Sequence, residues 1–455
     1  MVQKTSTDKG SIIFQTKAID DKIYIKEQKG FYQSIRRYLS VALMMLFIVT
    51  PFIQYQGKQA ILFDVEAQHL KVFSYYFYPQ DLLIFTFVFI IAAFALFYVA
   101  SKYGRIWCGF ACPQTVWTLM FLWIENRIEG NRQQRIKLDK SKISIEKCAK
   151  KLGKHGMWLT VSLITALVFM SYFVPAEQIY IEFFTLNTTS IVTGWVWFFA
   201  LCTYVNASWV REKMCQHMCP YARFQSVMFS DATSTVTYDI ERGESRGPRK
   251  LNREKPQELG DCVDCNLCVQ VCPVGIDIRD GLQYDCINCG LCIDACDQTM
   301  SKFSYAKGLI RFASETEQHS DSKAKYGYMA LLLICVGFMA NWLNNRSEFE
   351  VSVLKDRNAL YRVNGLGEVE NSYQLKILNK SDAKGHFKLS YQGLEGFRIE
   401  SKKTLIVAPQ QISNYTVTLI APLGFKGKFE TFDFVLQDES EEDKLLVTQS
   451  TFHSL

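Results

Sequence analysis

Five long apolar stretches without a charged residue dominate the first three quarters of the chain. A helix needs about 20 predominantly apolar residues to cross the hydrocarbon core of a bilayer, and each stretch approaches that length. The alternative is a set of buried core helices in a large globular protein, but the densely charged segments around the stretches leave no plausible core. We therefore predict five transmembrane helices, at residues 39–55, 82–100, 157–174, 191–210 and 326–343.

After residue 343 the helical pattern gives way to alternating apolar and polar residues, which is typical of half-buried strands. Five to seven short strands in about 110 residues favour an all-β sandwich of the immunoglobulin type. We expect this domain to serve docking or support, because it has no cluster of His, Cys or carboxylate side chains. The clearest predicted strands are residues 373–378, 386–391, 404–407, 415–420 and 432–436.

Lysine and arginine gather on one side of the predicted helices. Residues 1–37 hold eight of them and residues 101–156 hold twelve, whereas residues 56–81 hold two and residues 176–190 hold none. Because positively charged loops stay in the cytoplasm, we predict a multi-pass protein of the bacterial inner membrane with the 211–325 loop also inside. With five spans, the β-domain then lies in the periplasm. The charged loops account for the net charge of +6, so we expect no nucleic-acid partner.

The predicted membrane helices form two similar halves, so we expect a duplicated hairpin. Each half contains two spans joined by an outward loop and ends in the motif CxxxCP, first at Cys108 and Cys112 and then at Cys215 and Cys219. A short apolar segment follows each motif, at residues 116–124 and 224–229. We expect each segment to form an interfacial helix after a bend set by the proline.

Residues 262–296 carry two consecutive copies of the spacing Cys-x2-Cys-x2-Cys-x3-Cys. This is the ligand spacing of a bacterial ferredoxin with two [4Fe-4S] clusters, in which the fourth cysteine of each run binds the other cluster. We therefore expect a ferredoxin-like insert that carries electrons. The crossed ligand sets are Cys262, Cys265, Cys268 and Cys296 for one cluster, and Cys286, Cys289, Cys292 and Cys272 for the other.

Other uses of these eight cysteines fit the spacing less well. Zinc ribbons pair two CxxC knuckles across a gap, which neither run does. A disulfide framework is disfavoured because such crowded cysteines resemble a cluster loop in a reducing compartment. All 15 cysteines precede residue 336, so the predicted periplasmic tail has none, and the absence of CxxCH excludes covalent haem attachment.

The CxxxCP cysteines have two interpretations. If each pair lies on one helical turn, its two sulfurs point the same way, and the repeat could bring four thiolates together. Such a site could hold copper or a further metal centre, or act as a dithiol that accepts electrons at the membrane surface. Alternatively, the cysteines are small apolar residues at helix ends. The duplicated spacing favours a direct part in catalysis for Cys108, Cys112, Cys215 and Cys219.

Other cysteines and one histidine carry weaker signals. Cys202 and Cys335 lie in predicted spans, where a thiol is usually a small apolar residue, although soft sulfur also suits Cu(I). His217 lies between two candidate ligands and either joins a metal site or is solvated. Cys148 lies in a lysine-rich loop and has no expected role.

These features predict a multi-domain chain. No cleavable signal peptide is expected, because the first 30 residues are polar and charged, and the first span should act as the signal anchor. The expected regions are a cytoplasmic segment (1–37), a four-helix membrane domain (38–240), a ferredoxin domain (241–313), a hinge with the fifth span (314–343) and the β-domain (344–455).

With five spans, paired CxxxCP motifs, a double ferredoxin loop and an outward β-domain in that order, the chain resembles the FixG/RdxA/CcoG family of cytochrome oxidase accessory proteins. The motifs that carry the resemblance include residues 107–114, 215–221 and 356–361. The resemblance implies a role in the maturation of cbb3-type cytochrome c oxidase and the reduction of Cu(II) to Cu(I). Copper and the oxidase or its assembly factors are then the expected partners, together with an unidentified cytoplasmic electron donor.

Two other functions remain open at this stage. The membrane half also resembles quinol-linked subunits of nitrate respiration, which share CxxxCP but lack the β-domain. A redox-sensing assembly scaffold would use the same clusters without consuming an electron acceptor. The chain has no nucleotide-binding loop, GxSxG or HExxH motif, so ATPase, hydrolase and metalloprotease functions have no residue support.

Overall fold

The computed structural model describes residues 22–229, 232–251, 256–314, 323–356, 359–381, 383–402, 404–425, 427–439 and 445–454. Most of the predicted N-terminal segment and most of the hinge after Ser314 lie outside these residues. By contacts, the chain divides into one unit of residues 1–53 and 84–337 and a second unit of residues 54–83 and 338–455.

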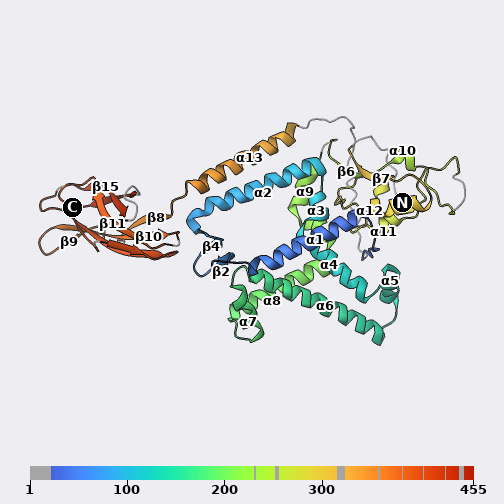
Figure 1. Cartoon of the computed structure of the whole chain (residues 1–455), viewed down its shortest axis with the longest axis horizontal. Helices are drawn as coiled ribbons and strands as arrows, with labels where there is room; N and C mark the ends of the chain where they lie inside the picture. The colour runs from blue at the N-terminus through green and yellow to red at the C-terminus, as the bar shows by residue number, and fades with distance from the viewer. Residues whose placement is uncertain are drawn as a thin grey trace. The chain divides into compact units, whose positions relative to one another are not determined.

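Among the described residues, five helices are long and apolar enough to cross a membrane, as the hydropathy pattern predicts (Figure 1). They cover Phe31–Phe52, Pro79–Tyr103, Ile145–Met170, Ser190–Val210 and Tyr326–Asn344. The third begins twelve residues before its predicted start, because its first three turns are polar and give no apolar signal. Ser144 caps this helix by accepting a hydrogen bond from the Lys147 amide, which fixes its start.

The helices of the first unit pack mainly through α4, α6 and α8. Trp158 of α6 is fully buried and stacks on Phe121 of α4, and its ring N–H donates to the Phe121 carbonyl oxygen at 3.1 Å. The helices are α1 (Phe31–Val49), α2 (Leu82–Tyr103), α3 (Ile106–Phe110), α4 (Pro113–Ile128), α5 (Arg132–Lys140), α6 (Ile145–Met170), α7 (Ala176–Phe184), α8 (Ser190–Val205), α9 (Pro220–Val227) and α13 (Lys323–Asn344), with π-helices η3 (Asn206–Val210) and η4 (Met214–Met218).

A helix follows each CxxxCP motif, as expected, and each begins at the motif's proline. Pro113 opens α4 and Pro220 opens α9, because proline lacks the N–H that a first helical residue would leave unpaired. The first of these helices is longer than the predicted segment and is more than an interfacial helix. It buries Val116, Phe121 and Ile124 against its neighbours.

The loop between the first two spans contains strands that the sequence pattern does not reveal. These strands belong to the second unit. They are short, and the segments between them are polar and rich in turns. The elements are η1 (Thr50–Phe52), β1 (Gln54–Tyr55), β2 (Lys58–Gln59), β3 (Ile61–Asp64), β4 (His69–Val72), β5 (Tyr75–Phe77) and η2 (Pro79–Asp81), with sheets β1-β2 and β3-β4-β5.

The ferredoxin region is closed by one two-stranded sheet. Strand β6 (Thr235–Tyr238) precedes the cysteine loops and pairs with β7 (Ile310–Ala313), which follows them. Between the two strands lie α10 (Ile240–Gly243), α11 (Leu267–Gln270), η5 (Ile278–Asp280) and α12 (Leu291–Lys302).

The C-terminal domain is the predicted immunoglobulin-like sandwich. One sheet has the order β12-β14-β10-β8, with β9 also paired to β10, and the other has the order β13-β11-β15-β16. All five of the clearest predicted strands are present, and the pattern missed four others. The strands are β8 (Phe349–Lys355), β9 (Arg362–Val363), β10 (Val369–Asn379), β11 (Gly385–Gln392), β12 (Arg398–Glu400), β13 (Thr404–Val407), β14 (Ile412–Ile420), β15 (Phe429–Asp438) and β16 (Leu445–His453).

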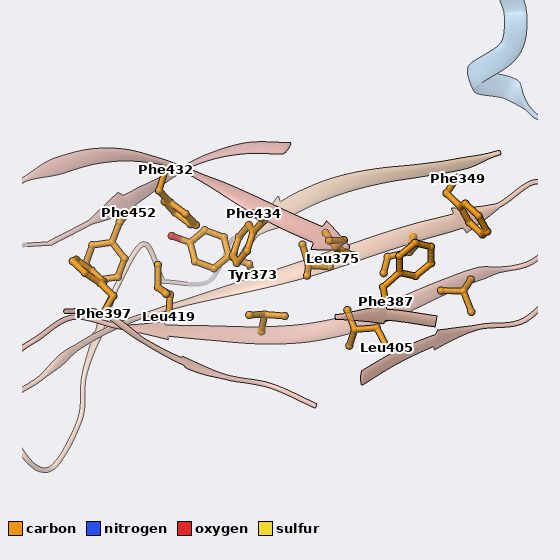
Figure 2. Close-up of a cluster of buried hydrophobic side chains, with 14 of the residues drawn as sticks. Phe349, Tyr373, Leu375, Phe387, Phe397, Leu405, Leu419, Phe432, Phe434 and Phe452 are labelled. Atoms are coloured by element: carbon orange, nitrogen blue, oxygen red, sulfur yellow. The ribbon is translucent and has the colours of Figure 1, made fainter. Parts of the chain in front are cut away.

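Aromatic rings fill the space between the two sheets (Figure 2). Tyr373 of β10 packs edge-on against Phe432 and Phe434 of β15, with ring centroids 5.6 and 5.3 Å apart. The Tyr373 hydroxyl donates to the Thr451 carbonyl oxygen, so its one polar group is satisfied. The second unit is thus stabilised by its own core, independent of the cysteines.

Candidate iron-sulfur and thiol site

The eight ferredoxin cysteines lie on two loop-helix segments. In the first run Cys268 lies on α11, and in the second Cys292 and Cys296 lie on α12. Each helix starts at a residue in the left-handed conformation, Asn266 (φ 55°) and Gly290 (φ 73°). These turns reverse the chain so that the start of each helix faces back toward its own loop.

Two cavities of nearly equal size lie between these segments. The first cavity is bordered by the first three cysteines of run one and by Cys296, the last of run two. The second cavity is bordered by Cys286, Cys289, Cys292 and Cys272, and also by Cys268. The fourth cysteine of each run therefore faces the cavity of the other run, which is the arrangement that crossed ligation needs.

The chemistry around the second cavity fits an anionic iron-sulfur cluster. Arg36 is fully buried within electrostatic range of Cys272 and Cys289, and its Nη1 has no hydrogen-bond partner among the described residues. Arg105 is also buried, is within range of Cys286, and its Nη2 is likewise without a partner in the described part of the chain. Buried cations are costly unless negative charge lies beside them; Asp294 supplies part of it at Arg36, and a cluster with four thiolates would supply more.

A single metal ion fits the same cysteines poorly. Within the described ranges, no three His, Cys, Asp or Glu side chains come close enough together to hold one ion. In a cubane cluster each thiolate binds a different iron, so the sulfurs are spread around the cube instead of converging on one point. The wide spacing thus agrees with two cubes.

Burial raises the pKa values of the cluster cysteines in the absence of metal. It raises the pKa of Cys286 to about 11 and the pKa values of Cys268 and Cys296 to about 12. The pKa values of Cys272 and Cys292 are raised further, also by burial first and by neighbouring cysteines second. Metal ligands must be thiolates, so cluster insertion displaces protons that these thiols hold at neutral pH.

The two CxxxCP motifs share one backbone geometry. The amide of the second cysteine donates to the carbonyl of the residue before the first, Cys112 to Trp107 and Cys219 to Met214, each at 2.9 Å. The expectation that each pair lies on one helical turn is wrong. Cys112 and Cys219 lie just outside α3 and η4 in extended conformation, because a residue before proline is disfavoured in helical geometry.

The structure nevertheless brings the four CxxxCP cysteines together, and we call them the thiol site. Every pair among them lies within electrostatic range. Cys108 is buried and the other three are half-buried. Burial raises the pKa of Cys108 to about 11 and that of Cys215 to about 12, and it also raises the pKa of Cys112. The Cys108 thiol donates to Gln225 Oε1 on α9 at 3.4 Å, which joins the two repeats.

The first motif packs directly on the second cavity. Cys108 belongs to an apolar cluster that also contains Ile287, Cys289 and Leu291, with Cys272 packed against it. The next residue, Gly109, leaves no room for a side chain, because a Cβ there would lie 2.6 Å from the Ile287 carbonyl oxygen. Continuous protein packing therefore connects the second cavity to the thiol site.

Arg105 connects the same two places electrostatically. Its Nη1 donates to the Tyr284 carbonyl oxygen at 2.6 Å, and its Nε donates to Gln225 Oε1 at 3.3 Å. Its charge lowers the pKa values of both Cys108 and Cys286, against the larger effect of burial. One buried cation thus favours negative charge at both sites.

The sequence did not predict several polar residues that surround the thiol site. Gln114 Nε2 donates to the Arg211 carbonyl oxygen at 3.0 Å and so links the end of one motif to the start of the other. Arg36, Arg105 and Gln225 carry no motif of their own. The two arginines lie next to apolar stretches, but the positive charge expected at the cytoplasmic ends of membrane helices already explains that position.

The weaker candidates differ in exposure and position. Cys148 and Cys202 are exposed, on α6 and α8, and Cys335 is half-buried on α13. His217 on η4 lies within electrostatic range of Asp285 in the second cysteine loop, so it faces the ferredoxin region.

Two protein families match the chain. Residues 210–315 match the family described as "4Fe-4S dicluster domain". Residues 339–454 match the family of the immunoglobulin-like fold at the C-terminus of FixG. The chain therefore carries a two-cluster iron-sulfur domain, and its β-domain has the fold that the alternating pattern predicts.

Similar proteins cover nearly the whole length. The "Nitrogen fixation protein FixG" of Rhizobium meliloti is 30% identical over 476 residues, which cover 93% of this chain and 91% of that protein. Proteins RdxA and RdxB of Cereibacter sphaeroides are 33% and 31% identical, and cover 83% and 81% of this chain and 83% and 82% of their own lengths.

Among solved structures, a FixG-related protein from Vibrio parahaemolyticus is 34% identical over 24% of this chain and 98% of its own, with a TM-score of 0.22. The full-length relatives and the two domain matches agree with the cysteine spacing and the five apolar helices. The chain belongs to the FixG/RdxA/RdxB family of membrane-associated iron-sulfur electron-transfer proteins.

Proposed function

We propose that this protein is a membrane-bound cupric reductase that serves the assembly of cbb3-type cytochrome c oxidase. Electrons enter at the ferredoxin region, pass to the thiol site and reduce Cu(II) to Cu(I). The observation that carries the proposal is the shared apolar cluster of Cys108 and Cys289, which leaves no solvent layer between the second cavity and the first CxxxCP motif.

The ligand sets are part of this proposal. The first cavity would hold one [4Fe-4S] cluster and the second cavity the other, and each cluster supplies one-electron transfer when bound. The residues of the chain do the rest: Arg36 and Arg105 balance negative charge, and the apolar walls exclude water. The ligands are Cys262, Cys265, Cys268 and Cys296 for the first, and Cys272, Cys286, Cys289 and Cys292 for the second.

Copper suits the thiol site because Cu(I) prefers soft thiolate ligands. The protonated thiols of Cys108 and Cys215 release a proton when they bind metal, so reduction and capture of copper occur together with thiol deprotonation. A site of four neighbouring thiols favours the product over Cu(II), which gives the electron transfer a direction.

The proposed topology places the ferredoxin region in the cytoplasm and the β-domain in the periplasm of a bacterial inner membrane. The charge bias of the loops supports it. Copper and the oxidase or its assembly factors are the partners that this location would allow, with the β-domain as the docking surface.

The test is a stoichiometry. Purified protein with both clusters reduced is mixed anaerobically with Cu(II), and Cu(I) is counted with a chromogenic chelator while cluster absorbance is followed. We expect two Cu(I) per chain, one for each stored electron. A redox-sensing scaffold would give none, and that result would overturn the proposal.

A further inference from the structure

A groove is lined by residues of α1 and α4 and by Leu291 of the ferredoxin region. Its volume is about 450 Å³, which lies within the usual range of small-molecule pockets. From α1 it takes residues 33, 37, 40, 41, 44, 45 and 48, whose spacing marks one helical face. Two helices of the first unit therefore form most of the groove, and residues 25–28 before α1 and Leu291 of α12 complete it.

The groove is polar at one end and apolar at the other. Phe47 near the end of α1 contacts Trp117 near the start of α4, so the two helices run antiparallel. Gln33 at the start of α1 and Asn126 at the end of α4 then share the polar end. Met and Ile side chains of the membrane-embedded part of α1 line the remainder, which suits a lipid-like molecule with a compact head and an apolar tail.

Two polar atoms of the groove lack partners. Gln33 Oε1 and Ser40 Oγ are hidden from solvent and accept or donate no hydrogen bond among the described residues. Arg37 forms an ion pair with Glu27 at 3.5 Å, so the arginine of the groove is already neutralised. Lys26 and Glu27 add one charge of each sign to the lining, and the amide and hydroxyl groups of Gln33 and Ser40 suit the hydroxyls of a quinol.

The polar end of the groove touches the wall of the second cavity. Leu291 lines both, and it precedes Cys292 directly in the chain. The backbone N–H of Gln33 donates to Asp294 Oδ2 on α12 at 2.9 Å. This bond fixes the start of α1 against the helix that carries Cys292. The groove and the second cavity therefore share the Leu291 side chain as part of their walls.

We propose that this groove binds a membrane quinol, and that the quinol is an electron donor to the clusters. The inference rests on the proposed function only in taking the clusters as acceptors. One quinol breaks its two O–H bonds, releases two protons to water and becomes a quinone, and its two electrons reduce the two clusters by one electron each. Quinols are weaker reductants than ferredoxins, and the buried charges of Arg36 and Arg105 raise the affinity of the second cluster for an electron.

Photolabelling tests occupancy independently of activity. The holoprotein in nanodiscs is irradiated with an azidoquinone, and labelled peptides are mapped by mass spectrometry. We expect label in residues 33–48 or 116–126 that excess unlabelled quinol removes. Label elsewhere only, or label that phospholipid removes and quinol does not, would overturn the proposal.

Cluster reduction by a short-chain quinol tests the route. Met120→Trp fills the groove and Gln33→Leu removes a head-group partner, and we expect each to slow quinol-dependent cluster bleaching at least tenfold. Tyr38→Phe, on the exposed side of α1, is the matched control and should match the parent. Iron content shows that each variant is folded and loaded, and equal rates in all four proteins would overturn the proposal.

Two failures remain distinguishable. If quinol leaves the clusters oxidised but chemically reduced clusters still pass electrons to Cu(II), the groove proposal alone is wrong. If quinol reduces the clusters but Cu(II) is left untouched, the copper function is wrong and the quinol site stands.

Discussion

Gly109 of the first CxxxCP motif packs on Ile287 of the second cysteine loop so closely that a Cβ at position 109 would lie 2.6 Å from the Ile287 carbonyl oxygen. Arg36 secures this contact by donating from Nε to the Gly109 carbonyl oxygen at 2.9 Å. The close approach places Cys108 and Cys289 in one apolar cluster.

Gly109→Ala should separate the thiol site from the second cluster. The new methyl group meets backbone on the other side, which cannot rotate away, so we expect about 1–3 kcal/mol of strain and a local shift. Stopped-flow mixing of reduced protein with Cu(II) should show slower cluster reoxidation, while iron content is unchanged. Gly156→Ala is the control, because nothing lies within 4 Å of a Cβ there; a variant at Gly109 that reacts as fast as this control contradicts the contact's role.

Paired cysteine substitutions should reveal the crossed ligand sets. Cys272→Ser with Cys289→Ser removes two ligands of one cluster, so about four irons should remain per chain. Cys272→Ser with Cys268→Ser removes one ligand from each cluster and should lower iron content further and change both EPR signals. If instead each run of four cysteines bound its own cluster, the variant with Cys268→Ser would keep more iron than the variant with Cys289→Ser. Iron and sulfide counts on the two double variants therefore distinguish crossed from sequential ligation.

Arg36 should set the reduction potential of the second cluster. A unit charge several ångströms away at an effective dielectric constant of about 20 contributes about 2 kcal/mol, which is on the order of 100 mV for one electron. Arg36→Gln should therefore lower one midpoint in an EPR-monitored redox titration by that order. Arg36→Lys keeps the charge and should shift it much less; equal shifts would mean that the residue acts through shape and not charge.

The segment at residues 22–26 should loosen in acid. Burial alone would raise the pKa of Asp139, but hydrogen bonds from Lys151, Tyr24 and Lys22 outweigh it and hold the pKa well below its usual range. Because the pKa of Asp139 is lower in the folded protein than its value of about 3.9 in the unfolded chain, the ionised carboxylate stabilises the fold at any pH above about 3.9. This stabilisation is lost as the pH falls from that value toward the pKa in the folded protein. Acidification from pH 6 to pH 3 should therefore reduce the protection of this segment's backbone amides against hydrogen exchange.

Asp139→Asn tests that dependence. After solvent screening we expect a loss of about 1 kcal/mol at pH 7, or roughly fivefold faster amide exchange in residues 22–29 by mass spectrometry. The difference between the variant and the parent should shrink progressively as the pH falls below about 4. Glu146→Gln, which breaks an exposed pair with Lys150, should change nothing measurable; a constant difference between Asp139→Asn and the parent at every pH would contradict the ion-pair explanation.

Hydropathy and cysteine spacing predicted the parts of this protein that are defined locally along the chain. The five apolar helices follow from runs that must be long to cross a bilayer, and strands such as β10 follow from alternation. The strands at residues 54–77 were missed because their short, half-exposed segments show no alternating pattern.

The thiol site was only partly predictable. Duplication of CxxxCP pointed to four cysteines, but local helix geometry gave the wrong conformation for Cys112 and Cys219, since the following prolines override it. Arg36, Arg105 and Gly109 were invisible because each depends on a contact with a residue far along the chain. The groove between α1 and α4 was missed for the same reason.

Reoxidation of the reduced clusters by Cu(II) in Cys108→Ser, compared with Cys148→Ser, tests the central claim most directly. Both variants remove one thiol, but Cys108 is buried against the second cavity and Cys148 is exposed on α6. We predict that Cys148→Ser transfers electrons at the parental rate and that Cys108→Ser, with its full iron content, is at least tenfold slower. Equal rates in the two variants would show that electrons reach copper without the thiol site.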